Sequence, residues 1–155
     1  MAYRIEGLSP EPFRSLFALP DEALADQRAL RVTADSPTGF PCRVSLEDAV
    51  PGDSLMLVNH VSHDVPTPFH TAFAIYVREA ASAPARYDDA VPEMLDRRTL
   101  GLRGFDGDGM LRGALLAMPG AADARIRELL ARPEIATIHA HNAAHGCFLA
   151  RIERN

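Results

Sequence analysis

Apolar and polar residues alternate in several short runs along the chain, a pattern typical of strands with one buried face. The runs are residues 3–8, 42–46, 72–78, 100–105, 135–141 and 147–152. Residues 55–58 are instead apolar on both faces, so we expect a central strand beside the strand over 72–78. Residues 110–118 fit either a strand or a helix.

Helical spacing is clearest over residues 122–130, between Pro119-Gly120 and Pro133. The apolar positions that recur at this spacing are Ala122, Ile126, Leu129 and Leu130. Two shorter helices are predicted near the N-terminus, one from about residue 10 to Leu16 and one from about residue 21 to Leu30. Each begins with a proline followed by an acidic residue, a pair favoured in the first helical turn.

The C-terminal residues form the clearest β-hairpin, with two strand patterns joined by the loop Asn142-Ala143-Ala144-His145-Gly146. Together these elements predict an α+β fold, with a mainly antiparallel sheet, a C-terminal β-hairpin and a few short helices packed on it. No internal repeat or shift in composition divides the 155 residues. A single domain over residues 1–155 is therefore expected.

Composition and charge narrow the classes of partner. Hydrophobic residues make up 47% and charged residues 24%, as in an ordered globular domain. The net charge of −5 and the absence of a basic cluster argue against a nucleic-acid partner. All sixteen basic residues are arginines, which excludes a lysine Schiff base and a P-loop lysine.

Targeting signals and cysteine content indicate where the chain resides. Neither a signal-peptide pattern nor an apolar run of membrane-spanning length is present. We therefore expect a cytoplasmic protein with no membrane partner. Its two cysteines, Cys42 and Cys147, are predicted to be reduced thiols, with Cys42 shielded in the core and Cys147 more accessible.

Reactive side chains gather on one face of the predicted hairpin if the loop closes with His141 opposite Cys147. The residues of the opposite, apolar face are Ile138, Ala140, Phe148, Ala150 and Ile152. His139, His141 and Cys147 then lie together, because alternate strand residues are about 6.6 Å apart. Two histidines and a cysteine are zinc ligands, so these three form the candidate metal site. Hydrogen-bonded or solvent-facing histidines without a metal are the alternative.

The same hairpin suits cysteine chemistry. Cys147 is a candidate nucleophile, with His141 or His139 as its base and Asn142 as an orienting group. An inert, buried Cys147 is the alternative reading. Arg43 is a candidate for binding an acidic ligand, and surface ion pairing is its alternative role. The candidate ligand-binding residues are Arg43, His139, His141, Asn142 and Cys147.

Three further histidines, His60, His63 and His70, fall on a predicted loop over residues 59–71. Loops often display functional groups on a rigid scaffold, so these side chains are candidates to complete the hairpin site. Solvated loop histidines are the alternative. The run Asp106-Gly107-Asp108-Gly109 is predicted to be a plain hairpin turn, because it lacks the remaining ligands of a calcium loop.

Several motifs together resemble an uncharacterised bacterial family catalogued as domain of unknown function number 1203. The motifs are Phe40-Pro41-Cys42-Arg43-Val44-Ser45-Leu46, Pro51-Gly52-Asp53, Thr67-Pro68-Phe69, Ala74-Ile75-Tyr76-Val77-Arg78, His139-Ala140-His141-Asn142-Ala143, Gly146-Cys147-Phe148 and Arg151. Relatives usually carry Ser-Pro-Tyr-Arg where this chain has Thr67-Pro68-Phe69-His70. The resemblance implies a small stand-alone bacterial protein and supplies no established reaction.

Three functions remain open on this basis. The first is binding of a small molecule or metal ion in a His/Cys-lined pocket on the C-terminal hairpin. The second is a small metal-assisted or cysteine-dependent hydrolase, with Cys147 and His141 as catalytic candidates. The third is a non-catalytic structural or partner-binding protein, such as a homodimer that hides this face. Ligand binding ranks first because it requires the fewest aligned groups.

Overall fold

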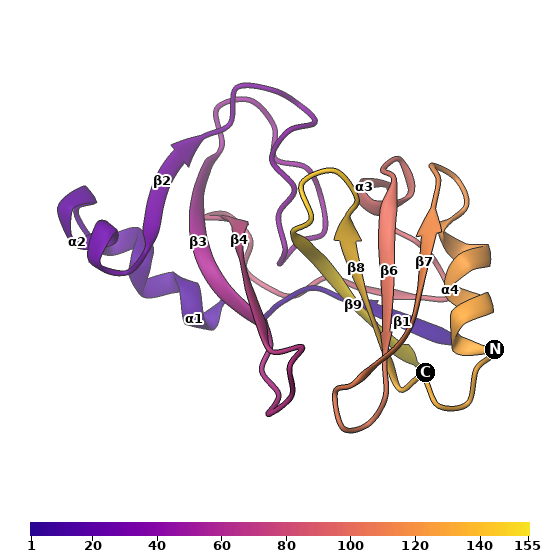
Figure 1. The fold of residues 1–155 in the computed structure, drawn as a ribbon. Coiled ribbons are helices and arrows are strands. Elements are labelled where there is room, and N and C mark those ends of the chain that lie inside the picture. The colour runs from indigo at the N-terminus through magenta and orange to yellow at the C-terminus, as the bar shows by residue number, and fades with distance from the viewer.

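The computed structural model describes all 155 residues, and its strands form two antiparallel sheets (Figure 1). A six-stranded sheet has the order β5-β1-β9-β8-β6-β7, and a three-stranded sheet has the order β2-β3-β4. The strands are β1 (Tyr3–Glu6), β2 (Ala29–Thr33), β3 (Ser54–His63), β4 (Thr71–Arg78), β5 (Arg86–Asp88), β6 (Leu100–Phe105), β7 (Leu111–Ala117), β8 (Thr137–Asn142) and β9 (Phe148–Arg154). The fold is α+β with a C-terminal β-hairpin, which confirms the predicted class.

The helices are short, with none longer than the nine residues of α4. They are α1 (Glu11–Arg14), the 3-10 helix η1 (Ser15–Ala18), α2 (Asp21–Asp26), α3 (Glu93–Asp96) and α4 (Ala122–Leu130). The predicted helix over residues 122–130 is confirmed as α4, which packs against β6 and β7. None of these helices has the length and apolar character that a membrane crossing requires.

The second N-terminal helix ends earlier than predicted. α2 stops at Asp26, and Arg28 adopts a positive φ of 53°. Residues 29–33 then form β2, in which Leu30 pairs with Leu57 of β3. Pairing with a neighbouring strand thus overrides the helical preference of this segment.

Buried apolar residues form two large clusters, one with each sheet. The cluster of the six-stranded sheet includes Leu102, Ile138, Ala140, Leu149 and Ile152, together with Ile126 and Leu129 of α4. The cluster of the three-stranded sheet includes Phe13, Leu24, Cys42, Met56 and Ile75. The chain contributes β1 to the larger sheet, builds the smaller sheet, and then returns to the larger one with β5.

The central strand of the smaller sheet is β3, which pairs with β2 on one side and β4 on the other. The predicted pairing of residues 55–58 with residues 72–78 is confirmed. Leu55 and Met56 are fully buried, whereas Leu57 is only half-buried, so the strand is not covered on both faces along its whole length. β3 also extends to His63, which places His60 and His63 in a strand rather than in the predicted loop.

Residues 42–46 are not the predicted strand. Residues 43–45 form a tight turn in which the Leu46 amide donates a hydrogen bond to the Cys42 carbonyl, at 3.0 Å. Four consecutive residues, from Pro41 to Val44, are buried because other segments surround the turn. The Arg43 carbonyl accepts from Leu8, and the Arg43 amide donates to the Tyr76 carbonyl. The alternation at Cys42, Val44 and Leu46 therefore arose from an enclosed turn.

Candidate functional site

A β-bulge between β8 and β9 sets the two faces of the C-terminal hairpin. Ala140 pairs with Ala150, whereas His141 pairs with Phe148, so Leu149 has no partner residue on β8. Leu149 lies in the hydrophobic core and is fully buried. The extra residue turns Phe148 toward the histidines, because a bulge reverses the alternation of the strand. The prediction that Phe148 shares the core face is wrong.

His139 and His141 lie on one face of β8, as the alternation predicts, with their rings stacked at 6.4 Å between centroids. Aromatic rings from both sheets surround them. The His139 ring lies 5.0 Å from that of His63 and 5.2 Å from that of Phe148, and the His141 ring lies 5.1 Å from that of Phe73. The two histidines thus belong to a packed layer between the sheets.

Burial lowers the pKa of both His139 and His141. The pKa of His139 is lowered to about 3, chiefly by burial and then by the neighbouring His63 and His141. Burial likewise lowers the pKa of His141, whose Nδ1 donates a hydrogen bond to the Gly146 carbonyl at 2.9 Å. His139 Nδ1 is buried without a hydrogen-bond partner.

The predicted zinc ligands do not converge. No group of three or more His, Cys, Asp or Glu side chains is placed to hold one metal ion. His139 and His141 pack against phenylalanine rings, while Cys147 precedes β9 and its sulfur contacts Arg43. Since the bulge changes the register assumed for Cys147, His139, His141 and Cys147 do not form the predicted metal site.

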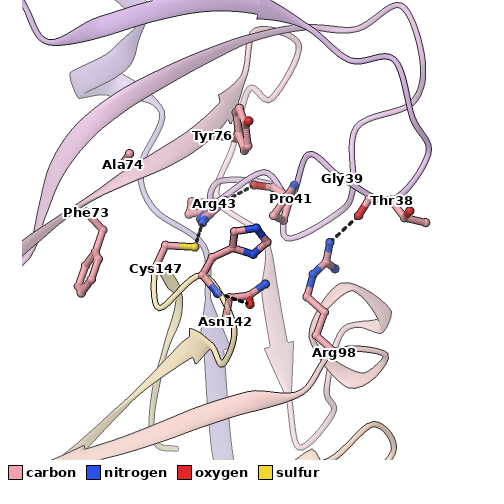
Figure 2. Close-up of a pocket in the computed structure, with 11 residues that line it drawn as sticks. Thr38, Gly39, Pro41, Arg43, Phe73, Ala74, Tyr76, Arg98, Asn142 and Cys147 are labelled. Carbon is pink, nitrogen blue, oxygen red and sulfur yellow. Dashed lines mark hydrogen bonds between the residues drawn. The ribbon is translucent and has the colours of Figure 1, made fainter.

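Cys147 instead lines a cavity of about 410 Å³ between the hairpin loop, strand β4 and residues 38–43 (Figure 2). The lining residues are Thr38, Gly39, Pro41, Arg43, Phe73, Ala74, Tyr76, Arg98, Asn142, His145 and Cys147. We call this cavity the Arg43 pocket. It contains two arginines and no aspartate or glutamate.

Arg43 is almost fully buried, with an exposed fraction of 1%. Its Nε donates to the Phe148 carbonyl at 2.8 Å and its Nη1 donates to the Pro41 carbonyl at 2.6 Å. Its Nη2 donates to the Cys147 sulfur at 3.1 Å (Figure 2). Burial lowers the pKa of Arg43, and the Cys147 sulfur opposes that shift. No carboxylate pairs with this guanidinium, which stays charged in proteins.

Arg98 is the second cation of the pocket and is fixed by Asp48. Its Nη1 and Nη2 donate to the two oxygens of the Asp48 carboxylate at 3.0 and 2.6 Å, and Nη2 also donates to the Thr38 carbonyl at 3.0 Å. Asp48 contacts Arg97 as well, so two guanidinium groups share one carboxylate. Arg97 also pairs with Glu93, at 3.9 Å, so two carboxylates face these two arginines.

Asn142 shapes the loop that carries Cys147. Its Oδ1 accepts hydrogen bonds from the amides of Ala144 and His145 at 3.1 and 3.2 Å. Its backbone amide donates to the Cys147 carbonyl at 2.9 Å. Gly146 completes the loop with a φ of +79°, a conformation that favours glycine. The Asn142 side chain thus holds the loop while lining the pocket.

Three of the five predicted ligand-binding residues, Arg43, Asn142 and Cys147, line the Arg43 pocket, whereas His139 and His141 do not. His141 also makes no hydrogen bond to Cys147, so the predicted nucleophile and base are not paired. Sequence reasoning missed Arg98, which follows another arginine and belongs to no recognisable motif. It also missed the aromatic lining residues Phe73 and Tyr76, whose strand pattern indicates only packing.

Comparisons with curated proteins and with solved structures found no match. A model of the family described as "Protein of unknown function (DUF1203)" matches residues 39–154. The matched segment contains every lining residue of the Arg43 pocket except Thr38. Because this match covers most of the chain, the protein belongs to the DUF1203 family.

Proposed function

We propose that this protein binds a small organic anion in the Arg43 pocket. The observation that carries the proposal is the buried guanidinium of Arg43, which has no carboxylate partner. An unpaired buried charge is costly, so buried charges in proteins are normally compensated. An anionic group in the adjacent cavity supplies that compensation.

The charge of the pocket supports this choice of ligand. The whole chain carries a net charge of −5, yet the pocket lining includes no acidic residue. Of its two arginines, Arg98 pairs with Asp48 outside the lining, whereas Arg43 has no carboxylate partner. Arginine binds carboxylates and phosphates through planar, charge-assisted hydrogen bonds. The local positive charge therefore favours a carboxylate or a phosphate ester over a cation or a neutral molecule.

The remaining walls of the pocket suit an organic group attached to that anion. Phe73, Tyr76 and Pro41 supply apolar surface beside the arginines. The volume of about 410 Å³ lies within the range of small-molecule sites, roughly 300–1,000 Å³. An aromatic carboxylate or an aryl phosphate combines the two required features.

Calorimetric titration with benzoate, phenyl phosphate and the neutral benzamide tests the proposal. The two anions are expected to bind, and benzamide is expected to bind at least about tenfold more weakly, since a charge-assisted hydrogen bond contributes about 1.5–3 kcal/mol. Equal binding of benzoate and benzamide, or no binding of either anion, would contradict the proposal.

A matched pair of variants locates the binding site. Asn142→Asp adds a negative charge to the pocket while retaining the Oδ1 acceptor that holds the loop. Asn59→Asp adds the same charge at an exposed position of β3 that is not part of the pocket. Asn142→Asp should weaken benzoate binding about tenfold or more, and Asn59→Asp should leave it nearly unchanged. Equal losses in both variants would place the binding elsewhere.

A further inference from the structure

Strand β4 has a free edge beside the Arg43 pocket. It is an outer strand of the smaller sheet, in which β3 is its one partner. Phe73, Ala74 and Tyr76 of β4 all line the pocket (Figure 2). An outer strand presents backbone N–H and C=O groups without a partner strand, and another chain can pair with them. One wall of the pocket is therefore a backbone edge as well as a set of side chains.

The hydrogen bonds at the end of β4 show which of its residues face this edge. The Tyr76 carbonyl accepts a hydrogen bond from the Arg43 amide at 3.1 Å, so Tyr76 faces away from β3. The Glu79 amide, directly after β4, donates instead to the Ser54 carbonyl of β3 at 2.9 Å. In an antiparallel pair, alternate residues bond to the partner strand and the residues between them do not. Ala74, two residues before Tyr76, therefore also directs its N–H and C=O away from β3.

A short segment already pairs with part of this edge. Cys42 forms a parallel bridge with Tyr76, so the chain next to Arg43 runs in the same direction as β4. The pairing ends there, because Ala74 and Ala72 are exposed and no segment beyond β3 bonds to their backbone groups. Residues that face the same edge of a strand are about 6.6 Å apart. The free part of the edge thus begins one such step from the bond between Tyr76 and Arg43.

Two N–H groups of the Arg43 side chain remain unused. A guanidinium has five N–H donors, one on Nε and two on each terminal nitrogen. Three of them donate to the Phe148 carbonyl, the Pro41 carbonyl and the Cys147 sulfur. One N–H is left on Nη1 and one on Nη2, and such a pair matches the two oxygens of a carboxylate. Asn142 also lines the pocket, and its Nδ2 makes no hydrogen bond within the chain, since the loop amides bond to its Oδ1.

We infer that the Arg43 pocket binds the C-terminal carboxylate of an extended peptide, which adds a strand to the free edge of β4. The inference rests on the proposed function, because the terminal carboxylate is the anion that Arg43 and Asn142 hold. The residues before that carboxylate pair with Ala74 and then with Ala72, so the peptide runs parallel to β4. In recognition by strand addition, main-chain hydrogen bonds supply affinity and side-chain pockets select the sequence.

The charge and the lining of the pocket select this occupant. A polypeptide C-terminus carries a carboxylate, whereas an internal segment has none and would leave the buried charge of Arg43 uncompensated. Phe73 and Pro41 supply apolar surface, which favours an apolar side chain at the last residue of the peptide. The chain's own C-terminus is not the occupant, because the Asn155 amide donates to the Ala2 carbonyl at 3.1 Å, where β9 pairs with β1.

Calorimetric titration with three probes tests the inference. The first is an acetylated pentapeptide of alternating valine and threonine that ends in valine with a free carboxylate, because these residues favour extended backbone. The second is the same peptide with a C-terminal amide, and the third is acetylvaline. The peptide acid should bind about tenfold or more tightly than the amide, which lacks the charge, and than acetylvaline, which lacks the strand. Equal binding of the peptide acid and either other probe would overturn the inference.

Ala74→Pro tests the assigned edge. Proline removes the Ala74 N–H, and because this group faces away from β3, the pairing of β3 with β4 keeps its hydrogen bonds. The variant should bind the peptide acid about tenfold or more weakly than wild type, while benzoate binding, which needs only the carboxylate site, should be nearly unchanged. Unchanged peptide binding in Ala74→Pro would overturn the placement of the peptide on β4.

A modified peptide provides the same test on wild-type protein should Ala74→Pro not fold. Backbone nitrogens of the peptide acid are methylated in one of its two alternating sets. Only one set faces β4, so methylation of that set should weaken binding about tenfold or more, and methylation of the other should have little effect. Equal effects of the two sets would overturn the strand pairing.

Benzoate titration of the same wild-type preparation separates this inference from the proposed function. Benzoate binding with equal binding of the peptide acid and acetylvaline supports anion binding and rejects strand addition. Tight, carboxylate-dependent peptide binding without benzoate binding supports the peptide inference and rejects a free small anion as the ligand. Binding of neither benzoate nor the peptide acid rejects both.

Discussion

Nη2 of Arg43 lies 3.1 Å from the sulfur of Cys147, although 104 positions separate the two residues along the chain. The same guanidinium also bonds to the carbonyls of Pro41 and Phe148. One buried cation therefore links the turn of residues 43–45, which contacts β4 of the smaller sheet, to the C-terminal hairpin of the larger sheet. The Arg43 pocket lies where these two segments meet.

Thiol labelling should distinguish the two cysteines. We expect native protein to react rapidly with a thiol reagent at Cys147, whereas Cys42 should react only on unfolding, because Cys42 has no exposed surface. The measurement is the number of thiols labelled before and after addition of urea. Rapid labelling of both cysteines in the native state would contradict the placement of Cys42.

Stability should fall in acid because of the buried histidines. An unfolded histidine takes up a proton near pH 6.5, while folded His139 stays neutral down to about pH 3. The unfolded state thus binds more protons in this window, so the stability present above about pH 6.5 is lost as pH falls toward 3. Between these two pH values, His139 alone lowers the free energy of unfolding by about 1.4 kcal/mol for each pH unit of acidification.

His139→Phe isolates this contribution. Phenylalanine fills the ring position among the neighbouring aromatic rings but takes up no proton, and His139 Nδ1 has no hydrogen bond to lose. Urea unfolding at several pH values below about 6.5 should show a shallower loss of stability in the variant. Parallel curves for wild type and His139→Phe would contradict the buried, neutral state of this histidine.

Two leucines of β3 should respond differently to the same truncation. Leu55→Ala removes a fully buried side chain and should cost about 2–5 kcal/mol through lost burial and a cavity. Leu57→Ala should cost less, since Leu57 is half-buried beside a surface groove with Leu30. Equilibrium unfolding in urea measures both values. A loss for Leu57→Ala equal to that for Leu55→Ala would show that the outer face of β3 is covered.

Gly146 should be sensitive to substitution through its backbone alone. At a φ of +79°, Gly146→Ala should destabilise the protein by about 1–2 kcal/mol, although an added Cβ meets no atom within 4 Å. Gly101→Ala is the matched control, because its Cβ also meets no atom and its φ is not in the left-handed region. Thermal unfolding of both variants tests this, and equal stability would contradict the loop conformation.

Local patterns were sufficient to predict the class of fold and several elements. Helical spacing predicted α4, and alternation predicted the two hairpin strands. The run of residues 55–58, apolar on both faces, predicted the central strand β3 and its pairing with β4. These signals depend on each residue and its near neighbours. They predict that strands exist but do not determine how many sheets the strands form, so the division into two sheets was not anticipated.

The candidate site was predicted only in part, for two physical reasons. The bulge at Leu149 adds one residue to β9, and the apolar Phe148 and Leu149 fit either face of a strand. Arg43 and Cys147 meet through tertiary packing, which leaves no mark on local spacing. Residue chemistry selected Arg43, Asn142 and Cys147 as candidates, and the fold brings these three together without His139 and His141.

The most direct measurement of the central claim compares alkylation of Cys147 by iodoacetate and iodoacetamide. The two reagents attack thiols by the same reaction, but only iodoacetate is an anion. If Arg43 and Arg98 make an anion-binding pocket beside Cys147, the ratio of the iodoacetate rate to the iodoacetamide rate should exceed that of free cysteine by about tenfold. The ratio should fall in Asn142→Asp and stay high in Asn59→Asp. A ratio equal to that of free cysteine in the wild-type protein would contradict a cationic pocket at Cys147.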